Sequence, residues 1–158
     1  MKLVVSISDY KISSSSEDEI ITHSLGSCIG LTLYDPVAVI GGLIHCMLPL
    51  SKNNKAKADA NPSMFVDTGI PLLLQVLFDM GAKRQRLIAK VAGGSNILDE
   101  KGMFKIGERN YMVLRKILWK NNILIDSEEV GGSQARTMIL RMNEGKTFIK
   151  SAGQEHEL

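Results

Sequence analysis

The sequence predicts an α+β fold, in which mostly antiparallel or mixed β-sheets pack with two main helices as a single compact domain. Three observations predict this class. More segments have the composition of strands than the periodicity of helices, and many of these strands are neighbours along the chain. Apolar residues recur at helical spacing in two stretches, 68–80 and 109–121. A chain of 158 residues is long enough to bury one core without disulfides or a structural metal.

Predicted strands dominate the first third of the chain. Runs rich in Val, Ile and Leu predict strands at 2–7, 20–23, 28–34 and 39–47. The serine-rich and acidic segment 13–19 has no periodicity and is expected to be a solvated loop. Asp35-Pro36-Val37-Ala38 has Asp and Pro at the first two positions of a turn. The strands on either side of this turn are therefore expected to form a β-hairpin.

The register of this hairpin decides which side chains meet. If Asp35 lies opposite Ala38, then Cys28 falls directly opposite His45, and both side chains point to the same face. Directly opposed residues have Cβ atoms about 4.5–5.5 Å apart, so the thiol and the imidazole would be within reach of each other. A bulge at Gly41–Gly42 would shift the register by one residue and separate the pair.

The middle of the chain begins with a polar, basic segment at 51–62, for which two interpretations stay open. It is either a loop that gates substrate or a connector without a role. The helix that follows at 68–80 is expected to be capped by Asp67 or Thr68. That cap would place Pro71 in the first turn, where proline is tolerated.

The remaining elements are a second helix at 109–121, with Trp119 packed at its edge, and further strands. The strands are expected at 86–92, 123–130, 134–142 and 147–150. The glycine-rich loop at 93–96 lacks the Gly-Lys-Ser/Thr ending of a phosphate loop, which argues against nucleotide binding. We expect one domain at 1–150 and a polar, frayed tail at 151–158.

Composition excludes several classes of function. The net charge of +2 is too small to indicate binding to nucleic acid or to an anionic membrane. Cys28 and Cys46 do not make a disulfide framework, and alternation puts them on opposite faces of the hairpin. No segment has the pattern of a signal peptide or the length of a membrane span. The expectation is a reduced, cytoplasmic protein without membrane insertion.

Several short motifs follow one another along nearly the whole chain, from Met1 to about Lys150. They are Thr22-x-x-Leu25-Gly26-Ser27-Cys28, Tyr34-Asp35-Pro36-Val37-Ala38, Gly41-Gly42-x-x-His45-x-Met47-Leu48-Pro49, Asp67-Thr68, Ala92-Gly93-Gly94, Ile106-Gly107-x-Arg109-Asn110 and Gly131-Gly132-x-x-Ala135-Arg136. Together they closely resemble the bacterial chemoreceptor glutamine deamidase family, CheD. One motif of this kind would be weak support, whereas the ordered set is specific.

Thiol catalysis is the chemistry that fits these residues. The thiolate is the reactive form of cysteine, and Cys28 needs a neighbouring base, which His45 would supply before acting as general acid and base. Backbone N–H groups at Cys28 and in the Gly26–Ser27 turn are candidates for the oxyanion site. The resemblance implies that Thr22 orients His45. No metal and no cofactor are expected.

The resemblance also implies a substrate and partners. The Cys28 thiolate would attack glutamine side chains on the cytoplasmic helices of chemotaxis receptors and form a thioester, which water would convert to glutamate. This reaction would serve chemotactic adaptation. A phosphatase of the CheC type is a possible partner, and nucleic acid is not.

Other interpretations of the same residues stay open. The protein could be a regulatory module that docks on a CheC-type phosphatase or on receptors with little turnover. A cysteine protease or a transglutaminase-like acyl transferase is disfavoured because the chain is small. Free cysteines are often buried and inert, and a histidine on an apolar strand is often a core residue. A zinc site is disfavoured because Cys46 should point away from Cys28 and no Cys-x-x-Cys spacing occurs.

Overall fold

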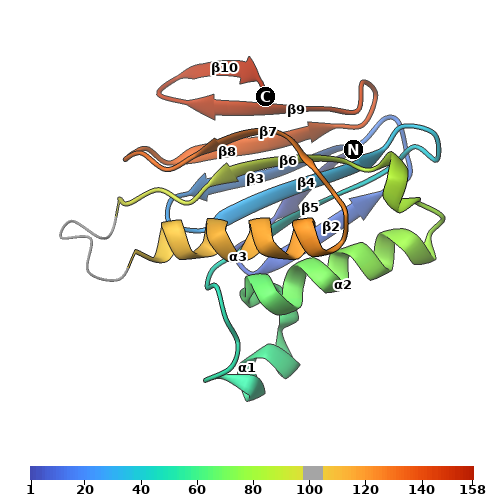
Figure 1. Cartoon of the computed structure of the whole chain (residues 1–158). Coiled ribbons are helices and arrows are strands. Elements are labelled where there is room, and N and C mark those ends of the chain that lie inside the picture. The colour runs from blue at the N-terminus through green and yellow to red at the C-terminus, as the bar shows by residue number, and fades with distance from the viewer. Residues whose placement is uncertain (98–104) are drawn as a thin grey trace.

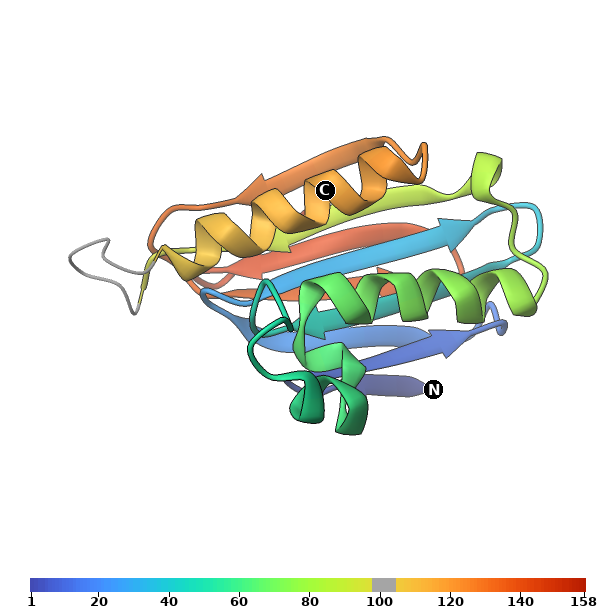
Figure 2. The ribbon, with the colours of Figure 1, turned by 60° about the horizontal axis from the view of Figure 1, so that its bottom comes forward.

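The computed structural model describes residues 1–97 and 105–158, and these residues form three layers. Helices cover one face of a five-stranded sheet, and the other face of that sheet packs against a second five-stranded sheet (Figure 1). We call them the helix-side sheet and the outer sheet. The two long helices lie over the helix-side sheet and run roughly along its strands (Figure 2).

The helix-side sheet has the strand order β2-β5-β4-β6-β7, and the outer sheet has the order β1-β3-β8-β9-β10. The strands of the helix-side sheet are β2 (Asp9–Ser13), β4 (Ile29–Asp35), β5 (Ile40–Cys46), β6 (Ile88–Gly93) and β7 (Ile125–Val130). Those of the outer sheet are β1 (Lys2–Val5), β3 (Glu19–Leu25), β8 (Arg136–Arg141), β9 (Lys146–Ser151) and β10 (Gln154–Glu157). The helices are α1 (Lys55–Ala60), α2 (Val66–Asp79) and α3 (Ile106–Lys120), with short 3-10 turns at Pro62–Met64 and Arg84–Arg86.

The predicted α+β class is confirmed. Most strand pairs are antiparallel, while β1 with β3 and β6 with β7 are parallel, so both sheets are mixed. One apolar core lies between the helices and the helix-side sheet, and a second lies between the two sheets. The strands β4 and β5 are buried on both faces, which explains their nearly continuous apolar sequences. The best-buried hairpin of the molecule is therefore the one that leads to the candidate residues.

The turn between β4 and β5 differs from the prediction. Asp35 pairs with Ile40 and not with Ala38, so the turn is two residues longer than expected. Val39 has a φ of 55°, in the left-handed region that β-branched residues rarely adopt. The Asp35 carboxylate accepts hydrogen bonds from the backbone N–H groups of Val37 and Ala38, which hold the wider turn.

The prediction that Cys28 lies directly opposite His45 is therefore wrong. Gly30 is opposite His45, and the ladder ends with the pair Ile29 and Cys46. A shift of two residues leaves every side chain on its predicted face, because the side-chain period of a strand is two. Cys28 and His45 share the face toward the outer sheet but are diagonal neighbours, a relation that places Cβ atoms about 7–8 Å apart.

Two strands were not predicted. The strand β2 pairs antiparallel with β5 along its whole length, with Asp9 opposite His45. Residues 151–158 are not a frayed tail, because β10 pairs antiparallel with β9 from Gln154 to Glu157. Glu155 on β10 forms ion pairs with Arg141 on β8 and with Lys150 on β9.

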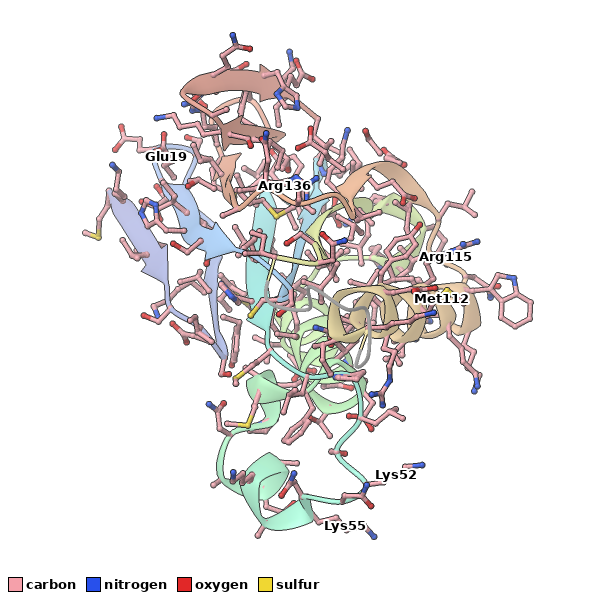
Figure 3. The ribbon with its side chains drawn as sticks, turned by 90° about the vertical axis from the view of Figure 1, so that its left-hand side faces the viewer. Glu19, Lys52, Lys55, Met112, Arg115 and Arg136 are labelled. Carbon is pink, nitrogen blue, oxygen red and sulfur yellow. The ribbon has the colours of Figure 1, made fainter. Side chains whose placement is uncertain are left out.

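The segments around the first long helix also differ from the prediction. The polar segment 51–62 contains α1 and is not a plain loop, although Lys52 and Lys55 project into solvent (Figure 3). The helix α2 begins at Val66, so Pro71 lies beyond its first turn. Trp119 is 76% exposed and is not packed at the helix edge. None of the described helices is long and apolar enough to cross a membrane.

Candidate active site

The segment Gly26–Cys28 is held by its carbonyl oxygens, each of which accepts a hydrogen bond from a different part of the chain. The donors are the backbone N–H of Ser95 to Gly26, the side-chain amide of Asn110 to Ser27 and the backbone N–H of Gly94 to Cys28, at 2.9, 2.9 and 2.8 Å. The backbone N–H groups of Ser27 and Cys28 donate to no other described residue. The N–H of Cys28 lies toward its own thiol, and that of Ser27 has no described acceptor.

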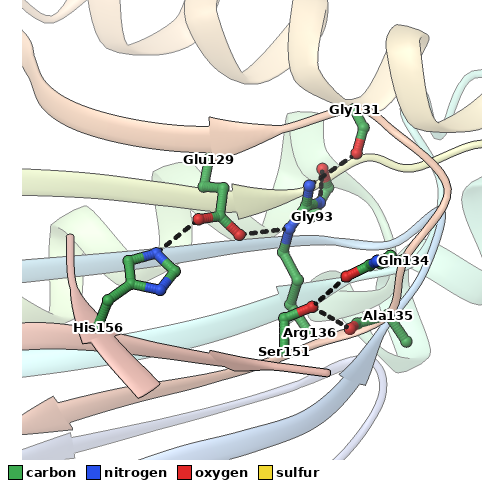
Figure 4. A network of polar contacts seen from close by, with 8 residues as sticks. All are labelled: Gly93, Glu129, Gly131, Gln134, Ala135, Arg136, Ser151 and His156. Atoms are coloured by element: carbon green, nitrogen blue, oxygen red, sulfur yellow. Dashed lines mark hydrogen bonds and ion pairs between the residues drawn. The ribbon is translucent and has the colours of Figure 1, made fainter. Parts of the chain in front are cut away.

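Glycine at position 93 is required for this arrangement. Gly93 has a φ of 107°, and a Cβ there would lie 2.4 Å from the carbonyl oxygen of Cys28. The carbonyl oxygen of Gly93 is fixed in turn by the Arg136 guanidinium, at 3.2 Å, and by the N–H of Gly131, at 2.9 Å (Figure 4). The outer sheet thus supports the loop that holds the cysteine.

Arg136 is itself part of a polar network between the two sheets (Figure 4). Its guanidinium donates to the carbonyl oxygen of Gly131 at 2.8 Å and to the carboxylate of Glu129 at 2.8 Å. Glu129 also pairs with His156 at 2.6 Å. Because the Arg136 side chain is nearly buried, this network fixes the first residue of β8 against the last residue of β6.

Thr22 joins His45 to the backbone of Val5 through a chain of two hydrogen bonds. The Thr22 hydroxyl donates to the carbonyl oxygen of Val5 at 2.7 Å, and Thr22 Oγ1 lies 2.7 Å from Nδ1 of His45. A hydroxyl has one proton, so Oγ1 must accept from Nδ1–H. Nε2 of neutral His45 is therefore unprotonated, and it is buried without a described partner. This tautomer leaves one basic nitrogen available.

The Cys28 thiol and His45 occupy the same face without a hydrogen bond between them among the described contacts. Gly30 lies opposite His45, so no side chain stands on the strand between the two groups. A Cβ at Gly30 would come within 3.0 Å of Leu25 and Met138, whose side chains cover this part of the face. The face is thus enclosed by the outer sheet.

Burial keeps both groups neutral. Burial raises the pKa of the Cys28 thiol, and its own backbone N–H offsets this only in part. Burial lowers the pKa of His45 from 6.5 to about 4. At neutral pH the site therefore holds a thiol and an unprotonated imidazole instead of an ion pair, so His45 would act as a base at the moment of attack.

Folding stability should depend on His45 between neutral and acid pH. In the unfolded chain His45 binds a proton below about pH 6.5, whereas in the folded protein it does so only below about pH 4. The stabilisation is therefore complete above pH 6.5 and is lost as pH falls to about 4; the difference corresponds to about 3 kcal/mol. Chemical denaturation across this range measures it, and a His45→Gln variant should lose this part of the slope. The pKa values of Asp18 and Asp35 are lowered from 3.8, so these two carboxylates change stability only at pH values below this window.

The remaining cysteine and histidines stand apart from the site. Cys46 is fully buried in the core beneath the helices, which confirms that it faces away from Cys28. Burial, followed by the charges of Cys28 and Asp67, raises its pKa. His23 is exposed on β3. No cluster of three metal-ligating side chains occurs in residues 1–97 and 105–158.

Sequence reasoning missed the residues that hold the cysteine segment. Gly94, Ser95 and Asn110 were noted only within motifs or loops, and no local pattern assigned them contacts with Gly26–Cys28. Gly94 and Asn110 belong to the ordered motifs and Ser95 only to the loop at 93–96, and neither signal indicates which residues lie close together in the fold. Asn110 is separated from Ser27 by 83 positions.

Comparison with known proteins gives consistent matches. A family model for CheD chemotactic sensory transduction matches residues 47–151. The probable chemoreceptor glutamine deamidase CheD 1 of Syntrophus aciditrophicus is 47% identical over 96% of this chain and 94% of its own. The probable chemoreceptor glutamine deamidase CheD of Solibacter usitatus is 45% identical over 99% of this chain and 93% of its own.

Solved structures give a weaker match. The crystal structure of Bacillus licheniformis hypothetical protein YfiH is 15% identical, with a TM-score of 0.49, over 79% of this chain and 50% of that chain. At these values the likeness bears on no function. The family-model match begins two residues after His45, so Thr22, Cys28 and His45 lie outside it. Their roles therefore have to be argued from geometry.

Proposed function

This chain belongs to the CheD family, and from this premise we propose that it deamidates glutamine side chains of chemotaxis receptors with Cys28, His45 and Thr22. The relatives at 47% and 45% identity are named as probable chemoreceptor glutamine deamidases. The observation that carries the site assignment is the Thr22–His45 hydrogen bond, which leaves Nε2 unprotonated on the face that Cys28 shares. The receptor helices would be met in the cytoplasm.

The first half of the reaction forms a thioester. As the sulfur of Cys28 bonds to the carboxamide carbon of glutamine, the thiol proton passes to Nε2 of His45. The negative charge on the substrate oxygen would be met by the N–H groups of Ser27 and Cys28, which donate to no other described residue. The His45 imidazolium then protonates the leaving nitrogen, the C–N bond breaks and ammonia departs.

The second half releases the product. His45 is neutral again and takes a proton from water, whose oxygen bonds to the thioester carbon. The C–S bond breaks, the proton on His45 returns to the sulfur, and glutamate remains on the receptor. Both oxyanion intermediates use the same N–H groups. Gly26 leaves the turn without a side chain, which lets the substrate approach the backbone closely.

A receptor cytoplasmic fragment is the substrate that tests this function. Incubation with the protein should release one molecule of ammonia for each glutamine that becomes glutamate. Binding of the fragment without release of ammonia would contradict the deamidase proposal and favour a docking role. A binding measurement with a CheC-type phosphatase would then be the next experiment, because that partner is a proposal from the same resemblance.

Replacing Thr22 by valine should reduce turnover by roughly 10²-fold, because the imidazole loses the acceptor that fixes its tautomer and orientation. The change also removes the hydrogen bond from the Thr22 hydroxyl to the buried carbonyl oxygen of Val5, which costs about 1 kcal/mol of stability. Thr22→Ser keeps the hydroxyl and is the matched control. Steady-state kinetics and chemical denaturation measure the two effects. Equal turnover of Thr22→Val and Thr22→Ser would remove Thr22 from the mechanism.

A further inference from the structure

We propose that Asn110 is a positioning residue for the reaction, which holds together the two chain segments that carry Cys28 and His45. One test of this proposal, the rate of glutamine deamidation, rests on the proposed function. The other test, the rate of Cys28 alkylation, does not. Among the side chains of residues 1–97 and 105–158, one donates a hydrogen bond to both segments. That group is the Asn110 amide, from the first half of α3.

The Asn110 amide occupies the place where the ladder between β4 and β5 stops. The last pair is Ile29 and Cys46, and the next two residues outward are Cys28 and Met47. Nδ2 of Asn110 donates to the carbonyl oxygen of Ser27 at 2.9 Å and to that of Met47 at 3.1 Å. One amide thus joins the two segments beyond the last ladder pair. Both partners are acceptors, so the orientation of the amide is fixed.

The helix α3 gives this amide a rigid base. Asn110 is fully buried, and Leu114, one turn further along, packs in the core against the helix-side sheet. Met112 and Arg115 point away from the sheet, on the outer side of the helix (Figure 3). Gly107 packs so closely that a Cβ there would lie 2.4 Å from the carbonyl oxygen of Ser95. The first turn of α3 therefore also supports the loop that binds the Gly26 carbonyl.

Buried side-chain atoms without a partner gather around this site. Among the described residues they are Oγ of Ser8, Nε2 of His45, Oγ of Ser95 and Oδ1 of Asn110. Ser8 donates its backbone N–H to His45, and Ser95 donates its own to Gly26, so all four belong to the site or contact it. An unpaired buried polar group destabilises a fold, and such groups concentrate where function requires them. Oδ1 of Asn110 is thus hard to explain by stability alone.

Positioning matters here because the register does not bring the two reactive groups together. Cys28 and His45 are diagonal, so their approach depends on how the chain bends after the ladder ends. Misplacement by about 1 Å can reduce turnover by roughly 10²-fold. Without the Asn110 amide, each segment would keep its other hydrogen bonds, but the contact that joins Ser27 to Met47 would be lost and their spacing less restricted. The thiol would become more exposed and more reactive toward small reagents, while turnover would fall.

The test compares Asn110→Ala with Leu118→Ala, a buried α3 substitution two turns away that leaves the amide and its own turn in place. Asn110→Ala should lower kcat by roughly 10²-fold with KM near that of the parent. It should also raise the rate of Cys28 alkylation by iodoacetamide at neutral pH. Leu118→Ala should lose at least as much thermal stability and change neither rate per folded molecule. Opposite shifts of turnover and alkylation are a result that a merely structural role would not give.

Asn110→Ser provides the second variant, since its hydroxyl can donate to only one of the two carbonyl oxygens. It should give intermediate shifts of both rates, and it decides the question if Asn110→Ala does not fold. Parent values of kcat and of the alkylation rate in a folded Asn110 variant would overturn the proposal. If the parent protein shows no deamidation, the deamidase proposal fails, and the alkylation rates alone still decide the role of Asn110.

Discussion

Replacing Cys28 by alanine is expected to reduce glutamine deamidation by roughly 10⁴-fold or more, because no other side chain can form the thioester. Receptor binding should persist, since the substitution removes one sulfur atom at a half-buried position. Ammonia release over long incubations measures the loss, and binding of the receptor fragment is measured on the same samples.

The matched control for this substitution is Cys46→Ala. Cys46 is fully buried on the opposite face of the hairpin, so its removal should lower stability and leave turnover per folded molecule unchanged. Turnover that survives Cys28→Ala, or that is lost in Cys46→Ala at equal folding, would contradict the assignment of the nucleophile.

His45→Gln should reduce turnover by roughly 10²–10⁴-fold, the usual contribution of a general acid and base. Because burial lowers the pKa of His45 to about 4, the acid limb of the parent's rate profile should fall near pH 4 instead of near 6.5. The variant should lack this limb. Steady-state rates across the pH range measure both effects.

The control for the histidine is His23→Gln, on the strand that carries Thr22. His23 is exposed, and its side chain makes no described hydrogen bond or ion pair, so its replacement should leave the rate profile unchanged. An acid limb near 6.5 in the parent, or one that persists in His45→Gln, would contradict the role of His45.

Local patterns were sufficient to predict the central hairpin and the faces of its strands. Alternation placed Cys46 in one core and Cys28 on the opposite face, and a two-residue slip of the register does not alter that assignment. The hairpin pointed to His45 and the family resemblance to Thr22, and the structure joins the two with a hydrogen bond. The contact between them was therefore accessible from the sequence, while the thiol chemistry of Cys28 stays a prediction.

The register and the supporting contacts were not accessible, because they depend on distant residues. Asp35 sets the wide turn with its own side chain, but that carboxylate is also bound by Arg86, 51 positions away. Valine rarely adopts a positive φ, so the residue type at position 39 gives no indication of this backbone conformation. The polar strands β2 and β10 exist because β5 and β9 offer edges to pair with, which no local composition reveals.

Peptide mass spectrometry of a receptor cytoplasmic fragment, incubated with the protein in buffer or in hydroxylamine, tests the central claim most directly. The wild type should convert particular glutamines to glutamate in buffer and partly to hydroxamate in hydroxylamine, which intercepts the thioester. Cys28→Ala should leave the same glutamines unchanged. Unchanged glutamines in a fragment bound by the wild type, or equal conversion by Cys28→Ala, would contradict a Cys28-dependent deamidase.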